Sequence, residues 1–427
     1  MSGKKCLIHC LFCAALLFVA VPSGHAQNPP PTPAACVPAP CPAPAPQKPP
    51  DEPRLEIYGF VMTDFGYNID TIDPLWFDTM RPTRLPSFPG EFGRNGNTFA
   101  GVRQTRNGVK AFIDTPKGEL KITFEWELFG TGVDAGQTTF RLRHAYGELG
   151  HFGAGQTWSP FMDPDVFPNS LEYWGPPGMV FFRNVQVRYM PVMTDHDNLT
   201  VALERPGSSQ DFSVFGVFVE EPNVAARFQY PDLSASYKHS GSFGYARVAA
   251  IVRNTKLDDT LPDQFNLNQS LTGWGINAST NIKVGSDKNV LKGSFVYGKA
   301  IENYMNDAPV DIATEPNPGH PTSPIKGVNL PVRGIVGFYD HYWSDKFSTS
   351  IGYSQTRITN TIFQSPRDFH KGDYALANLL VYPTNNVMFG GEFQWGRRSN
   401  FADGFRFNDY KIQFSFKFDY SAKISLK

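Results

Sequence analysis

Residues 410–427 read YKIQFSFKFDYSAKISLK, a run in which apolar and polar side chains alternate without exception. The even positions, from Tyr410 to Leu426, are apolar, and the odd positions, from Lys411 to Lys427, are polar. A period of two places the two sets on opposite faces of a β-strand. In a membrane barrel, the apolar face contacts lipid and the polar face lines a wet lumen, and about 9–11 residues suffice to cross the bilayer. The run therefore predicts a membrane-spanning strand.

The same alternation recurs from residue 54 onward. In residues 119–128 the polar positions include Glu125 and Glu127, and the positions between them are apolar. The 427 residues contain 38 glycines, 14% aromatic residues and 19% charged residues. Outside the N-terminus, no apolar run approaches the roughly 18 residues of a membrane helix. The sequence thus predicts an all-β fold, a transmembrane antiparallel β-barrel of about sixteen strands over residues 54–427, in contact with outer-membrane lipid.

The first 53 residues differ from the barrel in composition. Residues 1–26 are typical of a secretory signal, with two early lysines, an apolar centre at 7–21 and a small-x-small site at 24–26. Twelve of the 27 residues in 27–53 are proline, which predicts an extended spacer on the periplasmic side. Cys36 and Cys41 lie in this spacer, where they could pair with each other, link neighbouring chains or have no role.

The connections between the predicted strands fall into two kinds. Short ones near residues 115–118, 344–346 and 383–386 suit periplasmic turns, and long ones at 70–97, 303–330 and 359–371 suit external loops. The connection at 158–182 is unusual because it carries five prolines and several aromatic residues. We expect this loop to fold back into the lumen and narrow it. Its acidic residues are Asp163, Asp165 and Glu172.

Strand parity places a set of cations in the lumen, because an arginine that faces hydrocarbon is costly. These cations are Arg106, Lys110, Arg141, Arg143 and Arg188. If they face the acids of the loop, they form a basic constriction that favours anions. The alternative is that each arginine is ordinary wetted wall, paired with Glu125 or Glu127. The same parity places His144 and Tyr146 on the outer face, as candidates for a contact between subunits.

Four stretches together resemble one known family. They are FRLRHAYGEL (140–149), AGQTWSPFMD (154–163), GPPGMVF (175–181) and QVRY (186–189), and the combination resembles the DcaP-like family of outer-membrane porins. The resemblance implies a homotrimer, about sixteen strands, an inward third loop and a basic constriction for small anions such as dicarboxylates. Family members carry an N-terminal extension with coiled-coil character, and this chain has the proline-rich segment in its place.

Composition and motifs narrow the function further. The chain has 39 basic and 40 acidic residues, a balance that gives no argument for nucleic-acid binding. We find no nucleophile elbow, P-loop, H-E-x-x-H or zinc spacing, so we expect no enzyme activity, cofactor or metal. The interpretation is an outer-membrane porin for small anionic solutes. The alternatives are a barrel enzyme of the outer membrane, and a tether whose proline-rich segment contacts the cell wall.

Overall fold

The computed structural model describes residues 53–211, 219 and 221–425. The predicted signal, the spacer except its last residue, and both spacer cysteines (Cys36 and Cys41) lie outside the described residues. Among the described residues, six short 3-10 helices occur in the connections: η1 (Pro74–Trp76), η2 (Pro82–Arg84), η3 (Gly132–Asp134), η4 (Pro164–Val166), η5 (Glu221–Asn223) and η6 (Glu302–Tyr304). In the part of the chain that the structure describes, no helix is long and apolar enough to cross a membrane.

The remaining elements are strands. In the first half of the chain they are β1 (Arg54–Asn68), β2 (Asn97–Gly101), β3 (Arg106–Thr115), β4 (Gly118–Phe129), β5 (Thr138–Leu149), β6 (Phe152–Trp158), β7 (Arg183–Met193), β8 (Asp197–Glu204), β9 (Val224–Arg227) and β10 (Asp232–Gly241). In the second half they are β11 (Gly244–Asp259), β12 (Gln269–Val284), β13 (Ser286–Lys299), β14 (Ile312–Pro316), β15 (Ile325–Asn329), β16 (Pro331–Ser344), β17 (Phe347–Ile358), β18 (Phe369–Thr384), β19 (Val387–Asn400) and β20 (Arg406–Ser425).

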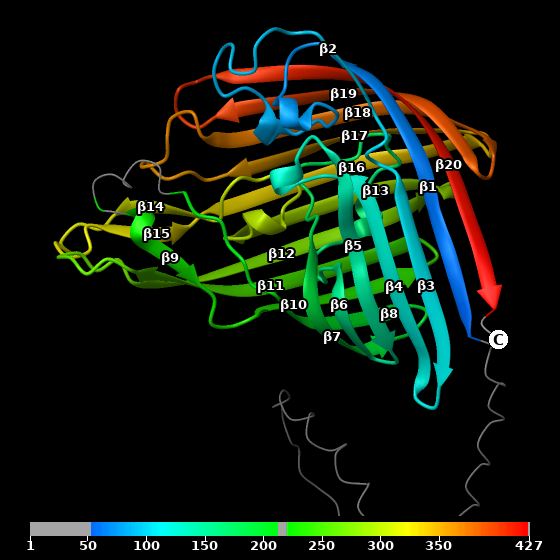
Figure 1. The fold of residues 1–427 in the computed structure, drawn as a ribbon, viewed down its shortest axis with the longest axis horizontal. Coiled ribbons are helices and arrows are strands. Elements are labelled where there is room, and N and C mark those ends of the chain that lie inside the picture. Colours follow the sequence, from blue (N-terminus) through cyan, green and yellow to red (C-terminus); the bar gives the residue numbers. More distant parts are fainter. Residues whose placement is uncertain (1–52, 212–218, 220, 426–427) are drawn as a thin grey trace, which may run out of the picture. The chain divides into compact units, whose positions relative to one another are not determined.

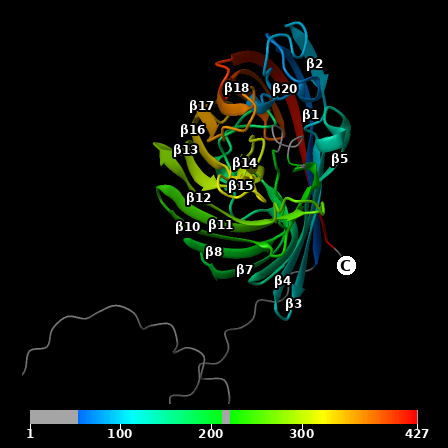
Figure 2. The same ribbon diagram turned by 90° about the vertical axis from the view of Figure 1, so that its left-hand side faces the viewer.

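These strands close into one antiparallel barrel. The first strand pairs with the last along its whole length, from Arg54 opposite Ser425 to Asn68 opposite Lys411, and Figures 1 and 2 show β1 and β20 side by side. Both β2 and β3 pair with β1, and both β9 and β10 pair with β11, so each couple fills one position in the wall. The wall therefore has sixteen strands, while β14 and β15 form a separate hairpin. The predicted fold class is confirmed.

In β20 the apolar side chains are exposed and the polar side chains are buried, the reverse of the pattern in a soluble protein. The outward Phe414 and Phe418 are 55% and 52% exposed, whereas the inward Lys411 and Gln413 are fully buried. This pattern follows directly from the alternation, since every second side chain of a strand lies on the same face. The lumen side of the wall is polar and crowded, and the outer side is apolar and open, as the hydrocarbon of a membrane requires.

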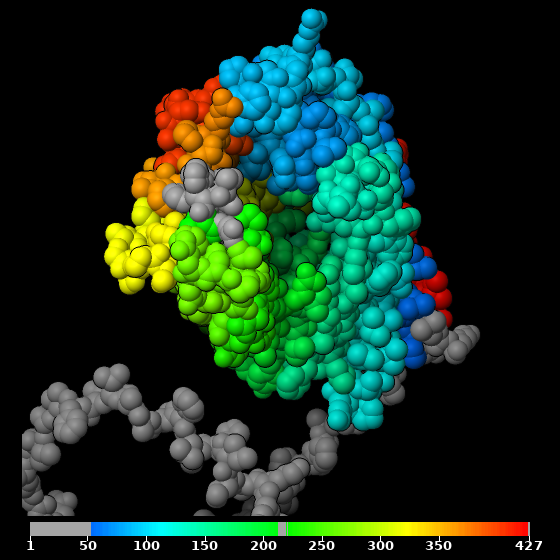
Figure 3. Space-filling model, turned by 60° about the vertical axis from the view of Figure 1, so that its left-hand side comes forward, coloured from blue at the N-terminus to red at the C-terminus, as the bar shows by residue number. Residues whose placement is uncertain are grey.

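The connections differ at the two ends of the barrel. The turns after β3, β16 and β18 are two residues long, in agreement with the short connections predicted there. The long connections at the other end carry most of the 3-10 helices and the β14–β15 hairpin. Figure 3, a space-filling view in which the long-loop end comes forward, shows a hollow bounded by the wall and by the long loops.

The loop between β6 and β7, residues 159–182, lies inside the barrel, as predicted. Its apolar side chains Phe161, Met162 and Met179 are buried in a cluster with Tyr304 from the β13–β16 connection and with Phe338 from the wall. Gly178 lies so close to the wall that a Cβ there would be 2.5 Å from the carbonyl oxygen of Ile335. Apolar packing on a largely polar lumen therefore fixes the path of this loop, which we call the constriction loop.

Candidate functional site: the constriction

A cluster of arginines and glutamates lies on the lumen side of β3, β4, β5 and the start of β7. We call it the arginine–glutamate cluster, and it consists of Arg106, Arg141, Arg143, Arg183, Glu125 and Glu127. Arg143 is at its centre, because its Nε lies 2.6 Å from Glu125 Oε1 and its Nη1 lies 2.6 Å from Glu127 Oε2. Bonds of this length between charged partners are among the strongest hydrogen bonds in proteins.

The other three arginines are arranged around Glu127 at longer distances. Its carboxylate oxygens lie 3.5 Å from Arg106, 3.6 Å from Arg141 and 3.7 Å from Arg183. The cluster thus sets four guanidinium groups against two carboxylates, which leaves an excess of positive charge. The side chains of Arg106 and Arg141 are 27% and 28% exposed, whereas that of Arg143 is only 5% exposed. The accessible part of the excess charge therefore lies on Arg106 and Arg141.

The constriction loop contacts this cluster through Tyr173. The Tyr173 hydroxyl donates to Glu127 Oε1 and lies 3.5 Å from Arg141 Nη1, while its ring stacks on Phe129 with 3.8 Å between the ring centroids. The phenol thus binds the most buried carboxylate of the cluster. This contact brings the loop to within hydrogen-bonding distance of the basic wall, and therefore narrows the lumen at the arginines.

Two recesses in the lumen wall flank the cluster. One has a volume of about 240 Å³ and contains Arg81, Arg141 and Glu302 beside the rings of Trp174 and Phe182. Burial raises the pKa of Glu302 well above its ordinary value. The second recess has about 260 Å³ and is reached farther along β3 toward the short turns. It contains three basic residues, Lys110, Lys121 and Arg188, and two acidic ones, Glu125 and Glu148. Basic groups therefore line the wall on both sides of the cluster.

All five cations predicted from strand parity face the lumen, but the prediction about their partners is wrong. Arg106, Arg141 and Arg143 pair with Glu125 or Glu127, the alternative left open by the sequence. Arg188 pairs with Glu148 at 3.1 Å, and the Lys110 ammonium lies 4.6 Å from the centre of the Tyr58 ring. None of these cations pairs with an acid of the constriction loop within the described residues.

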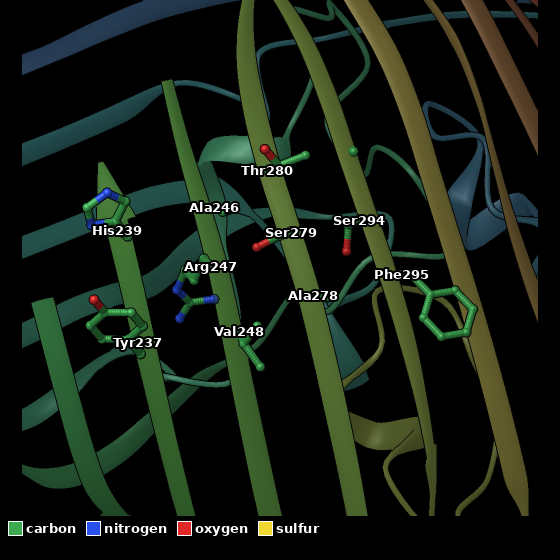
Figure 4. A pocket seen from close by; sticks show the side chains of 11 residues that line it. Tyr237, His239, Ala246, Arg247, Val248, Ala278, Ser279, Thr280, Ser294 and Phe295 are labelled. Atoms are coloured by element: carbon green, nitrogen blue, oxygen red, sulfur yellow. The ribbon is translucent and has the colours of Figure 1, made fainter. Parts of the chain in front are cut away.

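The three loop acids bind other parts of the wall. Asp163 accepts hydrogen bonds from Tyr245 at 2.9 Å and Ser279 at 2.5 Å, and Asp165 lies 2.7 Å from the Lys238 ammonium. Figure 4 shows this side of the wall, with Ser279 on β12 beside Arg247 on β11. These strands are not neighbours of β3–β5, so the loop crosses the lumen and its acids anchor it to the wall beyond.

The third acid, Glu172, is fixed in a buried position. Its oxygens accept the backbone N–H groups of Met80 at 3.0 Å and Gly175 at 2.5 Å, and the Lys411 ammonium lies 3.9 Å away. Burial raises the pKa of Glu172 from 4.5 to about 7, with a smaller contribution from Glu392, while Lys411 opposes the shift. The carboxyl therefore holds the loop in place and titrates near neutral pH.

We expect the barrel to lose stability as the pH rises through 7. A pKa that folding raises contributes stability below the ordinary value of 4.5, and this contribution is lost as the pH passes the raised value of about 7. The free energy of unfolding in urea should fall by roughly 2–3 kcal/mol between pH 5 and pH 8 through this group alone. The variant Glu172→Gln should show a smaller fall over the same range. Equal pH dependence in both proteins would contradict the assignment.

The prediction that His144 and Tyr146 face outward is wrong. The β4–β5 register shifts between Glu125, which is opposite His144, and Trp126, which is opposite Leu142. Arg143 is the extra residue of this bulge, so Arg143 and His144 both point inward and the parity is reversed beyond them. His144 Nδ1 lies 3.0 Å from Thr157 Oγ1, and the Tyr146 hydroxyl accepts a hydrogen bond from Arg188 at 2.5 Å.

Sequence reasoning also missed three members of the site. Parity assigns Arg183 to the outer face with Val185 and Val187, but it is the first residue of β7, where the side chain turns into the lumen toward Glu127. Arg81 and Tyr173 belong to long connections, for which no strand parity applies. The only available signal was the concentration of aromatic residues in the constriction loop.

No group of three or more His, Cys, Asp or Glu in residues 53–211, 219 and 221–425 could hold a metal ion.

A closed sixteen-strand antiparallel barrel with a loop folded into its lumen defines an outer-membrane porin. The chain belongs to the DcaP outer membrane protein family, whose model matches residues 94–311. The resemblance seen in the sequence is thereby confirmed. No curated protein matches the chain in sequence.

Several solved structures have the same fold as this chain. The outer membrane channel DcaP of Acinetobacter baumannii has a TM-score of 0.70 at 21% identity, over 86% of this chain and 98% of that one. An anion-selective porin from Comamonas acidovorans has a TM-score of 0.54 at 10% identity, over 86% of this chain and 100% of that one. OmpT of Vibrio cholerae has a TM-score of 0.53 at 11% identity, over 87% of this chain and 98% of that one.

Proposed function

We propose that this porin is a passive diffusion channel that prefers small anions, and dicarboxylates among them. The observation that carries the proposal is the composition of the arginine–glutamate cluster, four guanidinium groups against two carboxylates beside the constriction loop. A ring of basic groups at the narrowest section favours anions whatever the net charge of the chain. A guanidinium also offers a planar pair of donors that matches a carboxylate.

The two recesses support the preference for a dicarboxylate. A solute that passes the cluster leaves a recess that contains Arg81 and Arg141 and reaches one that contains Lys110 and Arg188. One carboxylate can therefore stay bound to a cation while the other end moves to the next. Sites that are occupied in turn, none of them very tightly, are what conduction requires.

We expect purified protein in planar bilayers to give a reversal potential of the sign for faster anions under a KCl gradient. In proteoliposomes, succinate should enter several times faster than succinamate, its monoamide, and succinamide should enter most slowly. The three solutes are matched in size, so the order reports charge. A reversal potential of the opposite sign, or equal entry rates for the three, would contradict the proposal.

The remaining features of the assembly are also proposals. From the family resemblance we infer a homotrimer, which the native mass of the detergent-solubilised complex will test. We further propose that residues 1–26 are a cleaved signal and residues 27–53 a periplasmic spacer. If this spacer contacts the cell wall, deletion of residues 28–50 will weaken the envelope without changing solute uptake.

A further inference from the structure

Three cations stand in a row on the outer wall of the barrel. The register places Arg333 of β16 directly opposite Arg357 of β17, and Arg357 directly opposite Lys371 of β18. Both arginines are exposed, and their neighbours Val332 and Ile358 are buried on the lumen side. Neighbouring strands are about 4.8 Å apart, so the three groups lie within roughly 10 Å of one another. We call them the outer basic row.

Within the described part of the chain, the Lys371 end of this row has an acidic partner and the two arginines have none. Like charges directly opposite each other destabilise a sheet. Asp373 is the only carboxylate paired with it, at 3.1 Å from the Lys371 ammonium, and the same oxygen lies 2.8 Å from Arg397. Neither Arg333 nor Arg357 pairs with an acid in the described residues. Both border a groove of about 310 Å³ together with Tyr297 and Thr359.

The position of the row on the wall identifies the kind of ligand. Toward the short turns, the outer face of the same strands is apolar, and Ile335, Ile351 and Leu379 are 38%, 54% and 50% exposed. Beside the row are aromatic rings, with Tyr297 directly opposite Arg333 and Trp395 beside Arg397. Aromatic girdles mark the membrane–water interfaces of such barrels. The row therefore lies at the level of lipid headgroups, at the end of the barrel that carries the long loops.

We propose that the outer basic row and its groove bind the phosphate groups of an anionic membrane lipid. Guanidinium groups match phosphate with two parallel hydrogen bonds, and Lys371 adds a third positive charge. The Arg333 and Arg357 side chains are then neutralised by the headgroup, while the acyl chains lie on the apolar band beside it. The proposal depends on the membrane location of the barrel and not on its selectivity for solutes.

Bisphosphorylated lipid A, titrated into the full-length protein in detergent, tests the proposal by native mass spectrometry. We expect the triple variant Arg333→Gln, Arg357→Gln, Lys371→Gln to bind at least tenfold more weakly than wild type. The matched control Lys283→Gln, Lys288→Gln, Lys346→Gln removes the same charge near the short turns and should change binding less than twofold. Dephosphorylated lipid A should bind wild type at least tenfold more weakly, a comparison that needs no variant.

Four results would overturn the proposal. The first is that the triple variant binds lipid A as tightly as wild type, and the second is that wild type binds dephosphorylated lipid A as tightly as lipid A. The third is that inorganic pyrophosphate displaces lipid A at the same concentration. The fourth is that the triple variant changes its oligomer mass but still binds lipid A. The third would indicate a site for soluble phosphate, and the fourth a contact between subunits. Unheated migration in detergent gels will confirm that both variants are folded.

Discussion

Replacing Arg106 and Arg141 by glutamine should abolish the anion preference of the channel. These two side chains are the accessible members of the arginine–glutamate cluster, and their loss leaves two arginines against two glutamates. A charge 4 Å from the path contributes about 1 kcal/mol in bulk-like water, or roughly fivefold in local anion concentration, and more where the loop excludes water. Two charges together should change the anion-to-cation permeability ratio by more than tenfold.

The measurement is the reversal potential in planar bilayers at low salt. At 0.1 M salt, screening already limits the range of each charge to about 10 Å, so a lower salt concentration makes the effect larger. The matched control is Arg333→Gln with Arg357→Gln, which removes two arginines from the outer wall and should leave selectivity unchanged. If the Arg106→Gln, Arg141→Gln variant keeps the wild-type reversal potential, these two arginines do not set the selectivity and the prediction is wrong.

The second large effect is on stability, and it should differ between Arg143 and Arg141, which strand parity assigns to the same face. Arg143→Ala should lower the free energy of unfolding by about 3 kcal/mol, because it leaves the buried carboxylate of Glu127 without its closest cation. Glu127 is fully buried, and its remaining arginines lie 3.5–3.7 Å away. Arg141→Ala should cost less than about 1 kcal/mol, since it removes a partly exposed pair at 3.6 Å.

Urea unfolding of the two variants in detergent, followed by tryptophan fluorescence, checks this difference. The double variant Arg143→Gln, Glu127→Gln should recover part of the loss, because it removes the uncompensated charge together with its partner. Equal losses for Arg143→Ala and Arg141→Ala would show that the 2.6 Å bonds of Arg143 carry no special weight.

Strand parity worked where each side chain faces either lipid or the lumen. It placed Arg106, Lys110 and Arg188 inside, and all three lie there. It failed for His144 and Tyr146, because the extra residue of the bulge at Arg143 reverses every later assignment on the strand. Arg183 was not among the cations that parity placed in the lumen, and it reaches Glu127 from the first position of β7.

The alternation of apolar and polar residues determined the barrel. Prolines and aromatic residues indicated the inward loop, and four stretches of sequence indicated the family. These features are local, since lipid on one side and water on the other decide each position separately. The partners of the charges were decided only by the tertiary structure. Asp163, Asp165 and Glu172 bind Ser279, Lys238 and Lys411, which lie more than seventy residues away in the chain. Which wall they reach depends on the path of the loop across the lumen, and that path is fixed by packing against residues distant in sequence.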